Sequence, residues 1–335
     1  MQFLYLQQMT KNFAFLSKVL LTFSLIILIG GNDLFSQKWK YYRHEFSTEV
    51  GGTNFLGELG GSDQYNPKFY HSDFDFRATR PSFGLGYGYK IHEKMNLRVN
   101  LLLARVAGSD EYTDNIYREV RNLSFRSSIY EASVQYEYYW LKEKTGASYK
   151  LKGIKSSLLS NISGYFFAGG GGIYFNPQAD YNGKWVDLPP LNTEGQGLLD
   201  NNGNIIPDYE QFTAIILAGA GFKLFLNKQM SISVEYAGRY TFTDYIDDVS
   251  TNYYDNTALR AAYGDASADL ADRNILISQP DYDGSSIEGN TLVPNLSWTG
   301  KDQQRGSPLS KDYYMYGTVG FHYKFLKGRS IKPRF

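Results

Sequence analysis

Hydrophobic and polar residues alternate along residues 230–242, which read MSISVEYAGRYTF. The even positions are mainly apolar or aromatic, and the odd positions are mainly polar or charged. Side chains on a β-strand point alternately to its two faces, so the pattern predicts a strand with one apolar and one polar face. The segment exceeds the usual strand length of about five or six residues. It is long enough for a membrane-crossing strand, which needs about 9–11 tilted residues.

Seven further segments alternate in the same way. They are residues 44–54, 82–91, 97–104, 123–140, 163–175, 212–226 and 313–325. The connections 92–94 and 227–229 are tight, 141–160 is intermediate, and the polar loops 176–211 and 243–311 are long. Short turns at one end, long external loops at the other and an even strand count are typical of outer-membrane barrels. The sequence therefore predicts an all-β fold, an antiparallel transmembrane β-barrel of about eight strands with long extracellular loops. Its first and last strands pair, so that no edge is left open.

Periodicity alone does not say which face of the sheet points inward. A soluble lipocalin-like barrel shows the same alternation with its apolar face inside. The length of the strands, an export signal and tyrosines at the ends of the apolar stripes favour the membrane form. Its interior would then hold the charged residues Glu45, Glu49, Arg98, Glu131, Glu137, Lys223, Glu235, Arg239 and Lys324. An eight-stranded barrel has room only for its own side chains, so we expect these charges to pair and leave no open pore.

The first 36 residues are predicted to be a signal peptide rather than part of the barrel. Lys11 and Lys18 precede an apolar run over residues 19–29, the arrangement of an export signal. The alternative of a membrane anchor is weaker, because a spanning helix needs about 20 apolar residues. We place cleavage near Ser36-Gln37, which leaves residues 37–335 as the barrel and 326–335 as a basic periplasmic tail. The predicted location is the outer membrane of a Gram-negative cell.

Composition removes several classes of protein. The chain has no cysteine, which excludes a disulfide scaffold and cysteine-based metal or nucleophile sites. Without residues 1–36 it carries 32 basic and 33 acidic residues, a balance that gives no reason to expect nucleic acid binding. The mature part has no apolar stretch of about 18 residues, so a helical membrane protein is excluded. The 29 tyrosines and 33 glycines suit strands, membrane interfaces and close backbone approach.

Several motifs are candidates for sites. Gly169–Gly172 lack the following Lys-Ser/Thr of a phosphate loop, and we interpret them as room for a curved sheet. Residues 200–204 (DNNGN) read as an Asx-rich turn, because the spacing of a calcium loop is missing. Asp244, Asp247 and Asp248 suggest either a solvated acidic rim or, less readily, a divalent cation site.

No catalytic, cofactor-binding or metal-binding residue is assigned, and we expect neither an enzyme nor a cofactor. Of the four histidines only His322 falls within a predicted strand, and no Ser-His-Asp set is recognisable from spacing. An enzyme at the rim that acts on lipid, using Asp244, Asp247 and His322, is the remote alternative. The surface expected to face periplasmic partners carries a set of basic residues. They are Lys142, Lys144, Lys150, Lys152, Lys155, Lys327, Arg329, Lys332 and Arg334.

Four stretches look like motifs: residues 121–131 (RNLSFRSSIYE), 181–185 (YNGKW), 193–197 (TEGQG) and 235–250 (EYAGRYTFTDYIDDVS). Together they resemble the PorG-like outer-membrane barrels that accompany the type IX secretion system of Bacteroidota. The resemblance implies a non-enzymatic barrel that sits in outer-membrane lipid and docks periplasmic ring proteins of that machinery. We predict no small-molecule substrate and no nucleic acid partner. The alternative is a surface binding or adhesion barrel that uses loops 176–211 and 243–311.

Overall fold

The computed structural model describes residues 38–59, 76–112, 116–141, 161–274, 299–308 and 310–325. The predicted signal peptide and the predicted basic tail lie outside these residues, and so does the connection 141–160 except for Leu141. The fold and the contacts given below are those of the described residues. A short 3₁₀ helix, η1 (Lys38–Tyr42), leads into the first strand.

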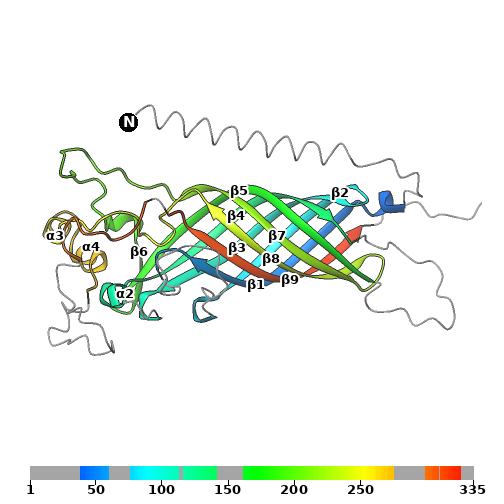
Figure 1. The fold of residues 1–335 in the computed structure, drawn as a ribbon, viewed down its shortest axis with the longest axis horizontal. Helices are drawn as coiled ribbons and strands as arrows, with labels where there is room; N and C mark the ends of the chain where they lie inside the picture. The colour runs from blue at the N-terminus through cyan, green and yellow to red at the C-terminus, as the bar shows by residue number, and fades with distance from the viewer. Residues whose placement is uncertain are drawn as a thin grey trace, which may run out of the picture. The chain divides into compact units, whose positions relative to one another are not determined.

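Eight long antiparallel strands form a closed barrel. They are β1 (His44–Leu56), β2 (Arg80–His92), β3 (Met95–Ser109), β4 (Ser124–Tyr139), β5 (Ile162–Tyr181), β7 (Phe212–Phe225), β8 (Met230–Thr241) and β9 (Tyr313–Phe325). The sheet order is β4-β3-β2-β1-β9-β8-β7-β5, and β4 also pairs with β5 (Figure 1). The predicted fold class, the eight strands and the pairing of the first strand with the last are confirmed.

The two ends of the barrel differ in their connections. The end with the tight β2–β3 and β7–β8 turns is called the turn end here, and the opposite end the loop end. Helices lie at the loop end (Figure 1): η3 (Phe76–Ala78), η4 (Asp110–Tyr112), α2 (Ile116–Arg121), α3 (Asn256–Tyr263) and α4 (Asp265–Ala271). None of the described helices has the length and apolar character needed to span a membrane.

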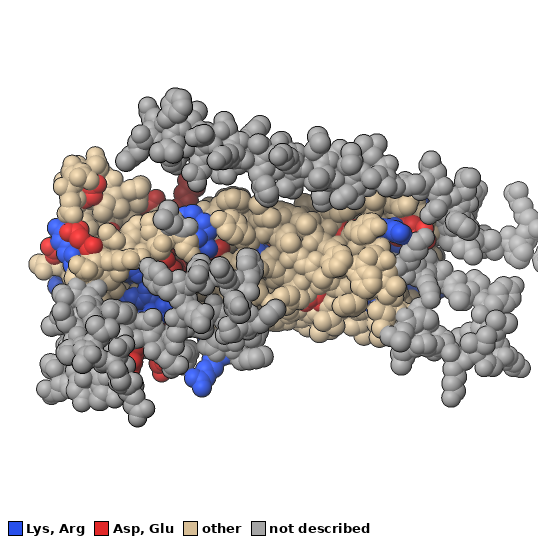
Figure 2. Space-filling model, viewed as in Figure 1, with Lys and Arg blue, Asp and Glu red and all other residues tan. Residues whose placement is uncertain are grey.

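The polar face of each strand points into the barrel. On β8, Val234 is 58% exposed whereas the next residue, Glu235, is 1% exposed. All nine charged residues expected inside are buried. The lipocalin-like alternative, with its apolar face inside, is therefore wrong. Figure 2 shows the result from outside, where uncharged residues form the wall and charges gather mainly towards its ends.

The interior is not polar along its whole height. Near the loop end, inward residues such as Val106, Phe125 and Phe175 pack with Ile246 and Val249 from the segment after β8. This apolar cluster closes the barrel above the charged layers. The strand alternation did not reveal it, because Ile246 and Val249 belong to a predicted polar loop.

Two predicted loops need correction. Residues 176–211 are not a loop throughout, because β5 continues to Tyr181 and turns back into β6 (Lys184–Asp187), followed by the 3₁₀ helix η6 (Pro189–Leu191). The turn is Asn182-Gly183 with φ of 54° and 77°, the left-handed conformation that these two residues adopt readily. The loop 243–311 contains α3 and α4. The described part of these two connections therefore contains short strands and helices as well as loops.

Candidate functional site

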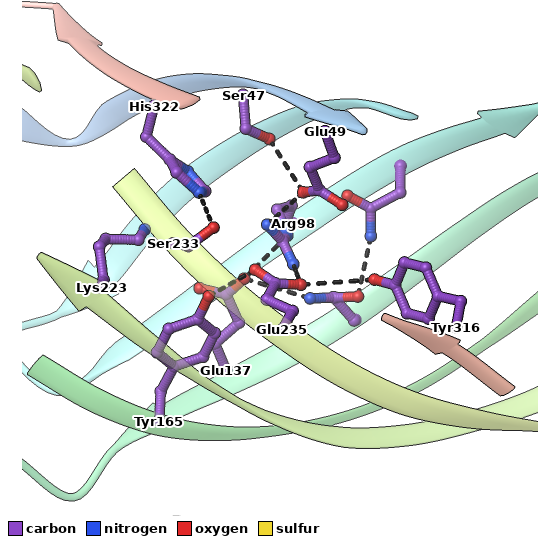
Figure 3. Close-up of polar contacts among 12 residues, drawn as sticks. Ser47, Glu49, Arg98, Glu137, Tyr165, Lys223, Ser233, Glu235, Tyr316 and His322 are labelled. Atoms are coloured by element: carbon purple, nitrogen blue, oxygen red, sulfur yellow. Dashed lines mark hydrogen bonds and ion pairs between the residues drawn. The ribbon is translucent and has the colours of Figure 1, made fainter. Parts of the chain in front are cut away.

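The middle of the barrel is organised around Arg98 from β3 (Figure 3). Its guanidinium contacts three carboxylates: Nη1 lies 2.7 Å from Glu49, Nε 2.9 Å from Glu137 and Nη2 2.6 Å from Glu235. The Tyr165 hydroxyl donates a hydrogen bond to Glu235. All these side chains are buried. A buried charge is tolerated only when paired and hydrogen-bonded, so this layer depends on Arg98.

Two further ion-pair layers flank Arg98. Towards the loop end, Arg239 holds Glu131 through Nε at 2.6 Å and Nη2 at 3.2 Å, and its guanidinium lies 3.8 Å from the Tyr316 ring centroid. Towards the turn end, Glu45 contacts Lys223 at 2.5 Å and Lys324 at 3.7 Å. The prediction that the interior charges pair is confirmed.

One interior contact has the order of a hydrolytic triad. Ser233 Oγ lies 2.7 Å from Nε2 of His322, and Nδ1 of His322 lies 2.7 Å from Oε1 of Glu45. A nucleophile, a base and an orienting carboxylate are linked in this way in serine hydrolases. Here Ser233 and His322 are at most 1% exposed, and Glu45 Oε1 also contacts Lys223. A substrate cannot reach Ser233 in this conformation, so the three groups serve as part of the interior packing.

At the loop end, the segments singled out in the sequence meet one another. Glu194 accepts a hydrogen bond from the backbone N–H of Ser250 and pairs with Arg305 at 3.0 Å. Thr193 donates to Asp248. Closer to the middle of the barrel, Glu131 pairs with Arg239, so that the stretch 121–131 contacts the stretch 235–250. We call the described residues beyond the strand ends at the loop end the cap. They are residues 57–59, 110–112, 116–123, 188–211, 242–274, 299–308 and 310–312.

Arg121 ties α2 into the cap. It contacts Asp110 through Nε at 2.8 Å and also donates to the backbone oxygens of Glu58 and Arg305. One side chain therefore joins three connections that are far apart in the sequence. Burial by itself lowers the pKa of Arg121, but the adjacent Asp110 outweighs it and holds that pKa well above the usual value. Arg121 is therefore charged within the cap.

The predicted solvated acidic rim is wrong, because its residues are buried in the cap. Asp244, Asp247 and Asp248 are at most 2% exposed. The loops fold over one another, so carboxylates that follow a strand become enclosed. Glu58, after β1, accepts a hydrogen bond from the Ser307 N–H, and Asp312, before β9, accepts one from the Ile246 N–H, so both carboxyls lie within the cap.

Burial raises the pKa of these carboxyls. The pKa of Glu58 and that of Asp244 rise to about 7, and that of Asp248 rises to about 6, with burial as the largest cause in each. The pKa values of Asp247 and Asp312 lie well above the usual range, because each is buried beside another acidic group. Oδ1 of Asp244 and Oδ2 of Asp247 have no hydrogen-bond partner among the described residues. Each of these carboxyls therefore keeps its proton to a higher pH than an exposed carboxyl does.

We expect the cap to be more stable at low pH. A raised pKa means that the folded cap binds protons more tightly than an unfolded chain, whose carboxyl pKa is about 4. This stabilisation is complete below about pH 4 and is lost as the pH rises through about 6–7. The N–H groups of Tyr253 and Arg305 donate to backbone oxygens within the cap. Their hydrogen exchange, corrected for its intrinsic pH dependence, should be about tenfold slower at about pH 5 than at about pH 8. Asp247→Asn should reduce the difference, and equal protection of the wild-type chain at both pH values would contradict the prediction.

The structure also shows the surroundings of the other motifs considered in the sequence analysis, namely the possible cation site, the turn 200–204 and the glycine run 169–172. In the part of the chain that the structure describes, no group of three or more His, Cys, Asp or Glu residues is arranged to hold a metal ion. Asp200 accepts hydrogen bonds from the N–H groups of Asn202 and Asn204, which confirms the Asx-rich turn. The glycine run lies within β5, where a Cβ at Gly169 would come 2.0 Å from the Val134 backbone oxygen. The interpretation of these glycines as room for the sheet is confirmed.

The predicted partner-contact residues all lie outside the described residues, both those of 142–155 and those of 327–334. Their role therefore stays a prediction. The sequence did not identify Arg121, Arg305 or Glu194 as members of a buried network, because the contacts that define it join distant loops.

Comparison with known proteins returns barrels of the same general kind. No protein-family model and no curated protein matches the sequence. Neisserial surface protein A is 9% identical, over 84% of this chain and 97% of its own, with a TM-score of 0.36. A major outer membrane protein of Thermus thermophilus is 10% identical over 84% and 99%, with a TM-score of 0.33. Outer membrane protein W of E. coli is 10% identical over 85% and 100%, with a TM-score of 0.31. At this level the similarity says nothing about activity, and the barrel assignment rests on the strand pairing itself.

Proposed function

We propose that the chain is a non-enzymatic β-barrel of the outer membrane that serves as a rigid anchor. The observation that carries this proposal is the combination of an apolar outer wall with an interior filled by paired charges. An exposed apolar surface of this extent needs lipid around it, and a closed sheet leaves no unpaired backbone in the hydrocarbon. A filled interior favours an anchor over a conduit.

The finer proposal is an accessory role in the type IX secretion machinery, in which the turn end docks periplasmic ring proteins. It is supported by the resemblance of residues 121–131, 181–185, 193–197 and 235–250 to PorG-like barrels. These stretches form parts of one connected unit at the loop end and in the wall. The basic residues of 142–155 and 327–334 are the proposed contacts, since they follow strands that end at the turn end.

Deletion of both basic segments, 142–155 and 327–334, tests the docking proposal. We expect the barrel to insert normally and to lose the periplasmic proteins that co-purify with it from native membranes, as measured by mass spectrometry. Deletion of residues 199–205, a hairpin tip at the loop end, is the matched control and should leave their recovery unchanged. Full recovery after loss of both basic segments would refute the docking role.

A second candidate is a surface binding barrel, and the cap favours it. Trp185, Leu199 and Ile205 are exposed apolar residues on an ordered loop end, with Ile205 70% exposed. Exposed apolar residues on a rigid scaffold are suited to recognition of another surface. Under this alternative, deletion of 199–205 removes ligand or cell binding while secretion continues.

A further inference from the structure

Two arginines lie side by side on the outer surface of the barrel near the loop end. On β3, the outward column of Leu101 and Leu103 is followed by Arg105. On β4, Arg126 also points outward. Arg105 pairs with Ser128 and Arg126 pairs with Ala107, so the two arginines are diagonal neighbours on one face. Diagonal neighbours on adjacent strands are about 7–8 Å apart, within reach of long side chains.

The strands set the depth of this pair relative to the apolar wall. Leu103 pairs with Tyr130, and the Tyr130 ring lies 6.2 Å from the Tyr174 ring. Exposed tyrosines of this kind mark the level where hydrocarbon gives way to headgroups. Arg105 lies two residues beyond Leu103 on β3, about 7 Å closer to the loop end along the strand. Arg126 lies four residues from Tyr130 on β4, about 13 Å closer to the loop end. With a strand tilt of about 35–45°, the guanidiniums lie about 5–10 Å above the tyrosines, in the headgroup layer.

Arg126 is held in position by the β5–β6 hairpin. Its Nε donates to Gln178 Oε1 at 2.9 Å, and its guanidinium lies 3.9 Å from the Trp185 ring centroid. The contact with Trp185 fixes the plane of the guanidinium, and Nε is the one nitrogen used by Gln178. The contact between Arg126 and Trp185 joins the stretches 121–131 and 181–185, and the anchor role does not explain why these two stretches meet.

The pair has no carboxylate that neutralises it within ion-pair distance in the described ranges. Asp180 acts electrostatically on Arg126 without forming an ion pair with it, and its carboxylate accepts from the Gly183 N–H. Asp187 accepts from Asn176 and Gln178. Two adjacent cations at headgroup depth repel each other unless an anion lies between them. A phosphate group has the charge and the geometry for two guanidiniums.

We propose that Arg105 and Arg126 form a binding site for a phosphate monoester on an outer-leaflet lipid headgroup, with Trp185 and Gln178 as positioning residues. A phosphate monoester carries nearly two negative charges, whereas the phosphodiester of phosphatidylcholine carries one that its own choline balances. The inference rests on the proposed insertion into an outer membrane. The occupant is a phosphorylated lipid rather than an acidic peptide, because the pair continues the lipid-facing columns of β3 and β4. A lipid bound at this site would be immobilised beside β3 and β4, and it would hold the β5–β6 hairpin at the membrane surface.

The test uses the full-length processed chain in phosphatidylcholine nanodiscs that contain a minor fraction of a diphosphorylated glycolipid. Native mass spectrometry measures how much glycolipid stays bound. The wild-type barrel should retain it, and Arg105→Gln/Arg126→Gln should retain about tenfold less, the loss of charge-assisted contacts. Lys184→Gln/Arg260→Gln removes the same charge from exposed positions at the loop end and is the matched control. It should behave as the wild type does.

The outcomes separate this site from the proposed anchor role. Equal retention by the double arginine variant, or equal loss in the control, overturns the site while insertion into phosphatidylcholine leaves the anchor intact. Retention of a dephosphorylated glycolipid to the same extent also overturns it, as does displacement of the lipid by a soluble acidic peptide. A chain that does not insert into any nanodisc overturns both proposals.

Discussion

Arg98→Met should destabilise the barrel by about 3–5 kcal/mol, the usual cost of removing one partner from a buried ion pair. Methionine fills a similar volume, so the loss is mainly electrostatic. Glu49, Glu137 and Glu235 would share one layer without the cation that contacts all three. Unfolding by urea in lipid vesicles, followed by tryptophan fluorescence and by the heat-dependent shift on denaturing gels, measures the change.

Arg105→Met is the matched control, because Arg105 lies on the same strand but points outward. In vesicles of phosphatidylcholine alone it should change the free energy of unfolding by less than about 0.5 kcal/mol, as expected of a surface substitution. Replacing Glu137 and Glu235 by Gln in the Arg98→Met chain should recover part of the loss, since fewer uncompensated charges remain. Equal midpoints for Arg98→Met and Arg105→Met would show that the interior layer does not hold the barrel together.

The strands were predictable because one face of each lies in the interior and the other outside. A change of one residue in register would expose Glu235 and bury Val234, so the alternation fixes both the faces and the pairing. The structure pairs Val234 with Phe222 and with Val319, all apolar and outward. Strand ends were predicted to within a few residues, except on β3 and β5, which extend beyond the membrane-facing pattern.

The β5–β6 hairpin was missed although its signal is in the sequence. Asn182-Gly183 is the dipeptide preferred in two-residue hairpins, and alternating residues precede it. Because residues 176–211 are predicted as one polar loop, the sequence pattern gives no position for Trp185. The contact between Trp185 and Arg126 was not predictable in any case, because it depends on the orientation of the hairpin relative to β4.

The buried cap and the interior layers lie beyond what spacing in the sequence reveals. Arg305 and Glu194 are 111 residues apart, and His322 and Glu45 are 277 apart. Local patterns carry no information on such pairs. Acidic residues in a Gly- and Asn-rich segment are usually solvated, and Asp247 departs from this because Ile246 and Val249 anchor the segment in the apolar cluster.

Val234→Lys should destabilise the barrel by about 2–4 kcal/mol in lipid vesicles, the cost of a lysine near the bilayer midplane on the lipid face of a barrel. Val234 is 58% exposed in the protein and lies near the middle of β8. In water such a position would accept lysine at little cost. The penalty therefore arises only if hydrocarbon covers this face, and urea unfolding in vesicles measures it.

Phe242→Lys provides the control for depth. Phe242 also points outward and is 53% exposed, but it follows the end of β8 at the loop end. Near the interface the same lysine should cost about 0–1 kcal/mol. A large difference between the two variants would locate the membrane around the middle of the barrel, with the arginine pair and the cap outside the hydrocarbon. Equal effects, or a Val234→Lys chain that is stable and soluble without detergent, would contradict a lipid-embedded wall and remove the basis of the anchor role.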